Sequence, residues 1–581
     1  MALDENATPL HNLYTRYLYG GESPEAAKKL WGLIPHTMGE AYKALVEARK
    51  SYKPDEASTE ELAKTIRRKM RSLGVLTGPV SEALDRLFNG VIEAGQQPMC
   101  LGGSSLILNK IVYIHAISHL GRDGFVPIFF VADYDGVQPE LLNMRTPSPS
   151  SRGLLVTYPA PPEFVGSPIH NLPNPDEVWL WKTIEKIEGN YRGLLRGAEQ
   201  GAQQRALQNL SHISMILKNG YYSTENVSDW STKTLASLVN VEGGLGIPFL
   251  VASDPEARRL FQAGYELLLS EPKRSFFIEA SNGAVDIIEG LGFRSQIGRR
   301  DDDYVPFFIE CSTPSCHGNR IELKYRKVEC SSAASVQGRC GRCSEVHEYS
   351  FNAAKPDLSE IAGSITPRVD SRQIIIDSVL PVLAHVGGPG ETSYYAEVIP
   401  GARALGIPFP VYLRYTRTFY NTPWNEAMAK KLALRGLPTL DREELFDALS
   451  AWVQAKREGN EEKLLKAHIH ISKTIDAAYS ELLERRQDLM AEIDAVKAKL
   501  GKVVERDKFL HEMRAKQVLL GEVEGYLSSA FGRFSPEKYG QEVSWLWIDL
   551  AAASGVRDLT GLFARQYSAG TPNSSVFYVN L

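Results

Sequence analysis

The sequence has no long apolar run and no strong excess of charge. None of its apolar stretches reaches the 18 residues that a membrane-spanning helix needs, so we expect no transmembrane segment. The opening residues, MALDENATPLHNLYTRY, lack the basic and apolar segments of a secretion signal, which predicts a cytoplasmic protein. The chain has 65 Lys and Arg against 70 Asp and Glu, a net charge of −5, so we do not expect the protein as a whole to bind nucleic acid electrostatically.

Cysteine is scarce but clustered. Five of the six cysteines lie between positions 311 and 343, a distribution that argues for a metal site rather than a disulfide framework. Two close pairs flank a β-like stretch, and four thiolates from such pairs make a closed, structural, tetrahedral zinc site of the ribbon type. The predicted ligands are Cys311, Cys316, Cys340 and Cys343. Reduced, unligated cysteines are the alternative, and the residues that can replace a ligand are Cys330, His317 and His347.

The length and composition predict several structural units around a discontinuous core. With 43% hydrophobic and 23% charged residues, the 581-residue chain resembles an ordinary globular protein of roughly three or four domains. The expected units are N-terminal helices with the first part of an α/β core (1–150), a mostly helical insertion (151–245), a continuation of the core (246–300), a zinc-ribbon-like β insertion (301–355), the last part of the core (356–435), and a coiled coil with a helical tail (436–581).

The segment from 91 to 135 has the pattern of a parallel α/β sheet. An apolar stretch, VIEAGQQPMC, runs into a Gly-rich turn, a helix follows, and the apolar strand VPIFFVADYD ends in acids. In such sheets, ligands bind beyond the carboxyl ends of the strands, near helix N-termini. That rule places one set of polar and glycine residues on a shared edge: Gln96, Gln97, Gly102, Gly103, Asp133 and Asp135.

The first Gly-rich turn offers backbone amides to a ligand. It matches neither GxGxxG nor a P-loop, so a plain structural turn is the alternative; Lys110 in the following helix can add a positive charge. Asp133 and Asp135 can hold an amine, a ribose hydroxyl or Mg²⁺, or transfer a proton, and they make the catalytic candidates. Their alternative role is to cap the next turn.

A second Gly-rich turn follows another apolar segment, VLPVLAHV. Three glycines in four residues allow the backbone to approach a ligand closely, and an acid then falls in the first turn of a helix. Arg372, shortly upstream, is a candidate clamp for an anionic substrate. A tight structural turn is again the alternative. The residues of this candidate site are Gly387, Gly388, Pro389, Gly390 and Glu391.

Proline is absent between Pro438 and Pro536, where a heptad of apolar residues appears instead. The repeat predicts a coiled coil or a long helical hairpin, which we expect to protrude and to form a homodimer. A long helix lying on its own domain is the alternative. The heptad positions are Ile475, Leu482, Leu489, Val496, Val503 and Leu510.

Taken in order, these motifs resemble a known family. The run GQQP–x3–GG–x6–K at 95–110, FFVA with acids at 129–135, SDPE at 253–256, VGGPGETSYYAEV at 386–398 and the C-terminal coiled coil are similar to the cysteine-adding enzymes of bacillithiol biosynthesis, the BshC family. The resemblance implies a Rossmann-like nucleotidyltransferase-type core and a ligase that joins the carboxyl of L-cysteine to the amine of glucosaminyl malate. The matching site residues are Gln96, Gln97, Gly103, Lys110, Gly387, Gly388, Pro389, Gly390, Glu391 and Tyr394.

The chain also departs from the family pattern. The core strand ends in Asp133-Tyr134-Asp135-Gly136, where the family has a histidine between acids, and the zinc-ribbon cysteines are additional, which suggests a divergent branch with its own amine acceptor. Amide formation requires an activated carboxyl, hence ATP or another nucleotide, although no HIGH or KMSKS element is present. The alternative function is a synthetase-like, non-catalytic protein that binds RNA or protein through the zinc ribbon and the coiled coil. The basic residues of the ribbon segment are Arg320, Lys324, Arg326, Lys327, Arg339 and Arg342.

Overall fold

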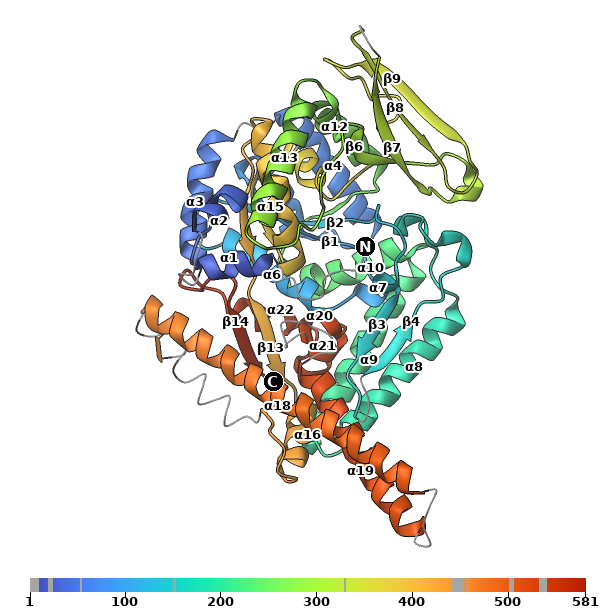
Figure 1. Cartoon of the computed structure of the whole chain (residues 1–581), viewed down its shortest axis with the longest axis vertical. Coiled ribbons are helices and arrows are strands. Elements are labelled where there is room, and N and C mark those ends of the chain that lie inside the picture. Colours follow the sequence, from blue (N-terminus) through green and yellow to red (C-terminus); the bar gives the residue numbers. More distant parts are fainter. Residues whose placement is uncertain are drawn as a thin grey trace.

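A parallel sheet of five strands lies at the centre of the computed structural model (Figure 1). The structure describes residues 10–18, 24–52, 55–149, 153–328, 331–440, 451, 454–455, 458, 460–500, 506–531 and 541–581. The strand order is β12-β11-β1-β2-β5. The bounds are β1 (Val91–Gln96), β2 (Val126–Val131), β5 (Phe249–Val251), β11 (Val382–Gly387) and β12 (Val411–Arg414). The prediction of a mixed α/β chain with a parallel sheet is therefore confirmed.

The central strands are buried on both faces because helices cover the sheet. All six residues of β2 are buried, as expected for a continuous apolar run in a parallel sheet. Helix α6 (Ser105–Ser118) connects β1 to β2, and α15 (Pro389–Ala404) connects β11 to β12. Because β1 pairs with both β2 and β11, the carboxyl ends of these three strands lie side by side.

The remaining helices of this part of the chain surround the sheet. Helix α13 packs along α15, and α4 packs against β5. The N-terminal set comprises α1 (His11–Leu18), α2 (Pro24–Trp31), α3 (Met38–Ser51), α4 (Glu56–Ser72) and α5 (Gly78–Leu84). The set after β5 comprises α11 (Pro255–Leu260), α12 (Gln262–Leu269), α13 (Lys273–Gly290) and α14 (Arg372–Asp377).

Two segments interrupt the central sheet in sequence. The first holds a short hairpin and helices: α7 (Pro139–Leu142), β3 (Asn143–Thr146), β4 (Leu154–Thr157), α8 (Glu177–Leu194), α9 (Gln200–Tyr222) and α10 (Val227–Ala236). The second is an antiparallel sheet that extends at one end of the molecule (Figure 1). Its strands are β6 (Tyr304–Glu310), β7 (Arg320–Lys327), β8 (Ala333–Arg339), β9 (Val346–Asn352) and β10 (Ile365–Pro367).

Two long helices, α18 (Glu461–Leu500) and α19 (Arg506–Tyr526), pack against each other at the opposite end (Figure 1). The heptad residues Ile475, Leu482 and Leu489 are buried in one cluster with side chains of α19. The seam is thus covered within the chain. The heptad residue Val503 lies outside the described residues.

The C-terminal residues return to the core. Strand β14 (Val576–Asn580) pairs in parallel with β13 (Arg417–Asn421), and Trp545 and Trp547 are fully buried. The helices here are α16 (Pro423–Ala433), α20 (Gln541–Ser544), α21 (Ile548–Ser554) and α22 (Leu559–Ala564). None of the helices in the described parts of the chain is both long and apolar enough to cross a bilayer.

Candidate functional site

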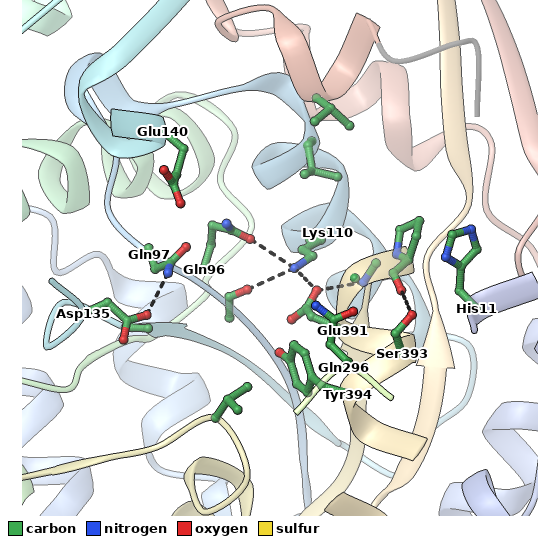
Figure 2. Close-up of a pocket in the computed structure, with 18 of the residues that line it drawn as sticks. His11, Gln96, Gln97, Lys110, Asp135, Glu140, Gln296, Glu391, Ser393 and Tyr394 are labelled. Atoms are coloured by element: carbon green, nitrogen blue, oxygen red, sulfur yellow. Dashed lines mark hydrogen bonds and ion pairs between the residues drawn. The ribbon is translucent and has the colours of Figure 1, made fainter. Parts of the chain in front are cut away.

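A cavity of about 1320 Å³ opens at the carboxyl ends of β1, β2 and β11. Gln96 ends β1, Ala132 follows β2 and Gly388 follows β11, and all three line it. The GQQP segment and the second Gly-rich turn, about 290 positions apart in sequence, therefore contribute to one cavity because their strands are neighbours in the sheet. Figure 2 shows Asp135, Gln97 and Glu140 on one side of the Lys110–Glu391 pair, and Ser393 and His11 on the other.

The centre of the cavity is an ion pair between Lys110 of α6 and Glu391 of α15. The Lys110 side chain is 2% exposed, and its ammonium also donates to the Gly95 carbonyl at 3.1 Å and to Gln96 Oε1 at 3.2 Å. Glu391 accepts a further hydrogen bond from the Gly388 amide at 2.7 Å. Lys110 thus fixes the carboxylate of one motif and the amide side chain of the other, rather than presenting an unpaired charge to a ligand.

Glu391 is held as a carboxylate by its neighbours. Burial raises its pKa, but the charge of Lys110 and the hydrogen bond and charge of His385 outweigh burial, so the pKa of Glu391 lies well below its ordinary value. A carboxylate in this state is a poor proton acceptor near neutral pH. Its chemistry is therefore electrostatic: it holds Lys110 and the first turn of α15 in place.

A second buried network lies beneath the cavity floor. Glu93 of β1 contacts His385 of β11 and accepts from Arg372 Nη1 at 3.2 Å, while Arg372 Nη2 donates to Tyr395 Oη at 2.9 Å. Burial raises the pKa of Glu93, but Arg372 and His385 lower it below its ordinary value. Arg372 lines the cavity with its guanidinium already engaged by these partners. Sequence reasoning missed Glu93, His385 and Tyr395; the available signal was a charged residue inside a strand predicted to be buried on both faces.

The acid side of the cavity is formed by Asp135, which follows β2. Its carboxylate accepts from Gln97 Nε2 at 2.7 Å and from Arg320 Nη1 at 3.1 Å. Glu140 lines the same side, whereas Arg294 belongs to the lining from the loop after α13. Acids, an amide and basic groups together make a cleft that suits a polar ligand carrying both an amine and an anionic group.

Asp133, the other predicted catalytic acid, lies outside the cavity lining. It is 1% exposed, and its two oxygens accept from the Ser253 amide at 2.8 Å, the Ser253 hydroxyl at 2.5 Å and the Ser228 hydroxyl at 2.9 Å. These bonds tie the end of β2 to the end of β5 and to α10. Asp133 therefore stabilises the loop that carries Asp135.

Some residues of the two predicted Gly-rich turns line the cavity and others lie outside it. Gly388, Gly390 and Tyr394 line the cavity, whereas Gly102, Gly103 and Gly387 do not. Gly102 has φ +85° and packs so closely that an added Cβ would lie 3.0 Å from Thr234 and Trp547. The first glycine pair therefore shapes a tight turn beneath the C-terminal tail, where Trp547 Nε1 donates to the Leu101 carbonyl at 2.8 Å.

The predicted metal ligands come together in the second interrupting segment. The thiols of Cys311, Cys316, Cys340 and Cys343 all lie within 4.8 Å of one another, a grouping that can hold a metal ion. Burial raises the pKa values of the Cys311 and Cys316 thiols. It also raises that of Cys340, but the backbone amides of Cys343 and Arg342 and the thiols of Cys311 and Cys343 bring the pKa of Cys340 down to about 6, so Cys340 is the thiol of these three that is favoured as a thiolate before an ion binds. The replacement ligand Cys330 lies outside the described residues.

Two histidines near these cysteines differ in position. His347 forms an overlapping candidate ligand set with Cys311 and Glu345. His317 instead packs its ring against Phe164, with the ring centres 4.3 Å apart. The four-cysteine set remains the better match to a closed structural site, because four thiolates complete the tetrahedron.

The fold and the cavity define the class: an α/β protein with a cleft lined by polar side chains at the carboxyl edge of a parallel sheet. No family model matches the chain. Its curated relatives include proteins named "Putative cysteine ligase BshC" from Carboxydothermus hydrogenoformans (24% identical, covering 81% of this chain and 80% of the relative), Desulforamulus reducens (24%, covering 54% and 52%) and Chlorobium phaeobacteroides (26%, covering 44% and 41%).

The sequence identities to these relatives are low, but the relatives all carry the same name. The chain spans about half the length of the Desulforamulus relative, two fifths of the Chlorobium one and four fifths of the Carboxydothermus one. The Bacillus cereus relative of the same name is 21% identical over 57% of the chain. The chain is thus similar in sequence, at low identity, to several proteins that carry the BshC name.

Proposed function

We propose that this protein is a cysteine ligase of bacillithiol-type thiol biosynthesis, with a Rossmann-like core of nucleotidyltransferase type. The reaction would join the carboxyl of L-cysteine to the amine of glucosaminyl malate or a related amino sugar. The observation that supports it best is the meeting of the GQQP and GGPGE segments in one cavity, since Gln96 and Glu391 share the ammonium of Lys110 there. Relatives of the same name support the choice of reaction.

The cavity residues suggest how the amide bond would form. The cysteine carboxyl enters in activated form, with ATP or another nucleotide as the activating reagent. Asp135 receives the acceptor's ammonium and takes its proton, the free amine attacks the acyl carbon, and the activating group leaves as the C–N bond closes. The Gly390 amide in the first turn of α15 would face the developing oxyanion, because the Gly388 amide is already bound to Glu391, and Gln96 and Gln97 would orient the two substrates.

The same proposal assigns Zn²⁺ to the four-cysteine site. Four thiolates leave no open position on the ion, so its role would be structural. A homodimer built through the α18–α19 pair and a cytoplasmic location also remain predictions. Because Ile475, Leu482 and Leu489 are already buried within the chain, such a dimer would use the outer faces of these helices.

The test is incubation of the purified protein with cysteine, ATP and glucosaminyl malate, followed by mass spectrometry for a new thiol. Asp135→Asn should lower turnover about 100-fold or more, because a general base contributes on that scale. The melting temperature should change only slightly, since Asn keeps an oxygen that can accept from Arg320 or Gln97. Asp301→Asn, an exposed acid outside the cavity, is the matched control. Full turnover by Asp135→Asn would exclude the proposed role of Asp135.

The alternative function, binding of RNA or protein through the basic ribbon residues, has less support from the contacts. Arg320 pairs with Asp135, Lys324 with Asp303, and Arg342 donates to backbone carbonyls. RNA binding with a steep salt dependence, together with no thiol product, would favour the alternative.

A further inference from the structure

The predicted metal centre (Cys311, Cys316, Cys340 and Cys343) lies in contact with the segment that supports the acid side of the cleft. The residues directly after Cys316 form a knuckle, 316–320. Its residue Asn319 contacts two of the other predicted ligands: the Asn319 carbonyl accepts from Cys311 N at 3.0 Å, and Asn319 Nδ2 donates to Cys340 Sγ at 3.6 Å. Any ion that draws the four thiols together therefore also fixes the backbone of this knuckle.

Arg320 connects the knuckle directly to the cleft. Its guanidinium donates to Asp135 Oδ1 at 3.1 Å and to the Pro367 carbonyl at 3.1 Å, and it stacks over the Phe308 ring at 4.2 Å. The side chain is 16% exposed. A planar guanidinium held by two acceptors and an aromatic face has one favoured orientation, so Arg320 can set the position of the Asp135 carboxylate.

A second connection runs through the segment 163–171. Arg342, next to the metal ligands, donates to the carbonyls of Glu163 and Val165. Asn171 Nδ2 donates to the His317 carbonyl at 3.1 Å, and Ser167 Oγ to the Cys316 carbonyl at 3.4 Å. Arg342 thus holds the start of this segment, and the knuckle holds its end.

The segment 163–171 in turn holds the loop that carries Asp135. The Val137 amide donates to the Ser167 carbonyl at 2.7 Å, and the Ile169 amide donates to the Asp135 carbonyl at 2.9 Å. The His170 amide donates to the Asp133 carbonyl at 3.1 Å. Three backbone bonds and one side-chain ion pair therefore lead from the metal centre to the loop 133–137 by two separate routes.

We propose that the four-cysteine metal centre positions the acid side of the cleft: with metal bound, the knuckle holds Arg320 and the segment 163–171 against the loop 133–137 and fixes the Asp135 carboxylate. Arg320 is a positioning residue in this arrangement. The inference rests on the proposed function only for the chemical role given to Asp135. The structural coupling itself can be measured without any enzymatic assay.

Hydrogen exchange of the full-length protein, with zinc bound and after chelation, tests the coupling. The amides of Val137, Ile169 and His170 should exchange at least about tenfold faster without metal, and re-addition of zinc should restore them. The amides of β1 and β11, which form the opposite part of the cleft, should not change. Faster exchange confined to 304–352, with the three reporter amides unaffected, would overturn the proposal.

A variant that keeps all four cysteines makes the test independent of metal loss. The combined substitution Arg320→Ala, Ser167→Ala, Asn171→Ala and Arg342→Ala removes the side-chain contacts of both routes. This variant should bind one zinc per chain, as measured by elemental analysis, yet show the same faster exchange at Val137. Arg326→Ala, an exposed arginine on the same strand, is the control and should behave like the unmodified protein. If this combined variant exchanges at the unmodified rate, the two routes do not carry the coupling and the proposal is wrong.

The ligation assay adds a second measurement, the difference between the two substrates in their kinetic constants, which a general change in protein stability would not alter. Arg320→Ala should lower kcat/KM for the amine acceptor roughly tenfold with the KM for cysteine unchanged, and Arg320→Lys should restore part of that loss. An equal loss for both substrates would contradict a specific role at Asp135. If no thiol forms with any variant, the proposed function fails, whereas the exchange results still decide the coupling.

Discussion

Replacing Lys110 with methionine removes the cation from the centre of the cleft while keeping most of the side-chain volume. Lys110 is 2% exposed and Glu391 17%, so the substitution leaves a largely buried carboxylate without its principal partner. Breaking a buried ion pair costs about 3–5 kcal/mol, and because the Gly388 amide still binds Glu391, we expect the lower end, roughly 3 kcal/mol. The Gln96 side chain and the Gly95 carbonyl lose a donor as well.

The assay should report on the sheet itself, because a chain of several units need not unfold in one step. Hydrogen exchange at the β1 and β11 amides does so, and 3 kcal/mol corresponds to roughly 100-fold faster exchange through opening. The double variant Lys110→Met, Glu391→Gln should recover most of the loss, since it leaves no unpaired charge. Lys64→Met, at an exposed pair with Glu60, is the control and should change nothing measurable. Equal effects at positions 110 and 64 would refute the reasoning.

Two further predictions concern the same turn. The folded-state pKa of Glu391 lies below its ordinary 4.5, so its stabilisation is present above about pH 4.5 and is lost as the pH falls toward the folded value. Glu391→Gln should therefore flatten the acid limb of a stability–pH curve, and an unchanged limb would contradict this assignment. Gly387→Ala would place a Cβ 2.5 Å from Tyr412 Oη and 2.8 Å from Glu391 Cβ, which should cost about 1–3 kcal/mol in urea unfolding. Gly283→Ala, in an open helical position, should stabilise slightly instead, and the same sign at both sites would count against the packing argument.

The two acids after β2 show how far local sequence reaches. The apolar run VPIFFV followed by acids was enough to predict a parallel strand with carboxylates at its end, and the structure has that strand. Which acid faces the cleft depends on Ser228 and Ser253, which bind Asp133 from α10 and from the end of β5. No property of the short segment 133–135 distinguishes the two acids before those partners are placed.

The first Gly-rich turn was open to two interpretations for the same reason. Glycines at 102 and 103 are compatible with both ligand contact and close packing, so the local sequence does not distinguish the two roles. The structure has the C-terminal tail against this turn, with Trp547 hydrogen-bonded to Leu101. A contact between residues more than 400 positions apart leaves no periodic signal in either segment.

Local patterns by themselves determined the parallel α/β sheet, the helical and β-rich interruptions, the long C-terminal helices and the pairing of four cysteines, because apolar periodicity, turn residues and ligand spacing act over a few residues. Tertiary structure alone decided that Lys110 forms an ion pair with Glu391 and that Glu93 and His385 are buried together. It also decided that Arg320, which belongs to a separate sheet, pairs with Asp135. Each of these depends on how distant strands and loops are brought together, and a charge finds its partner only after the backbone has placed both.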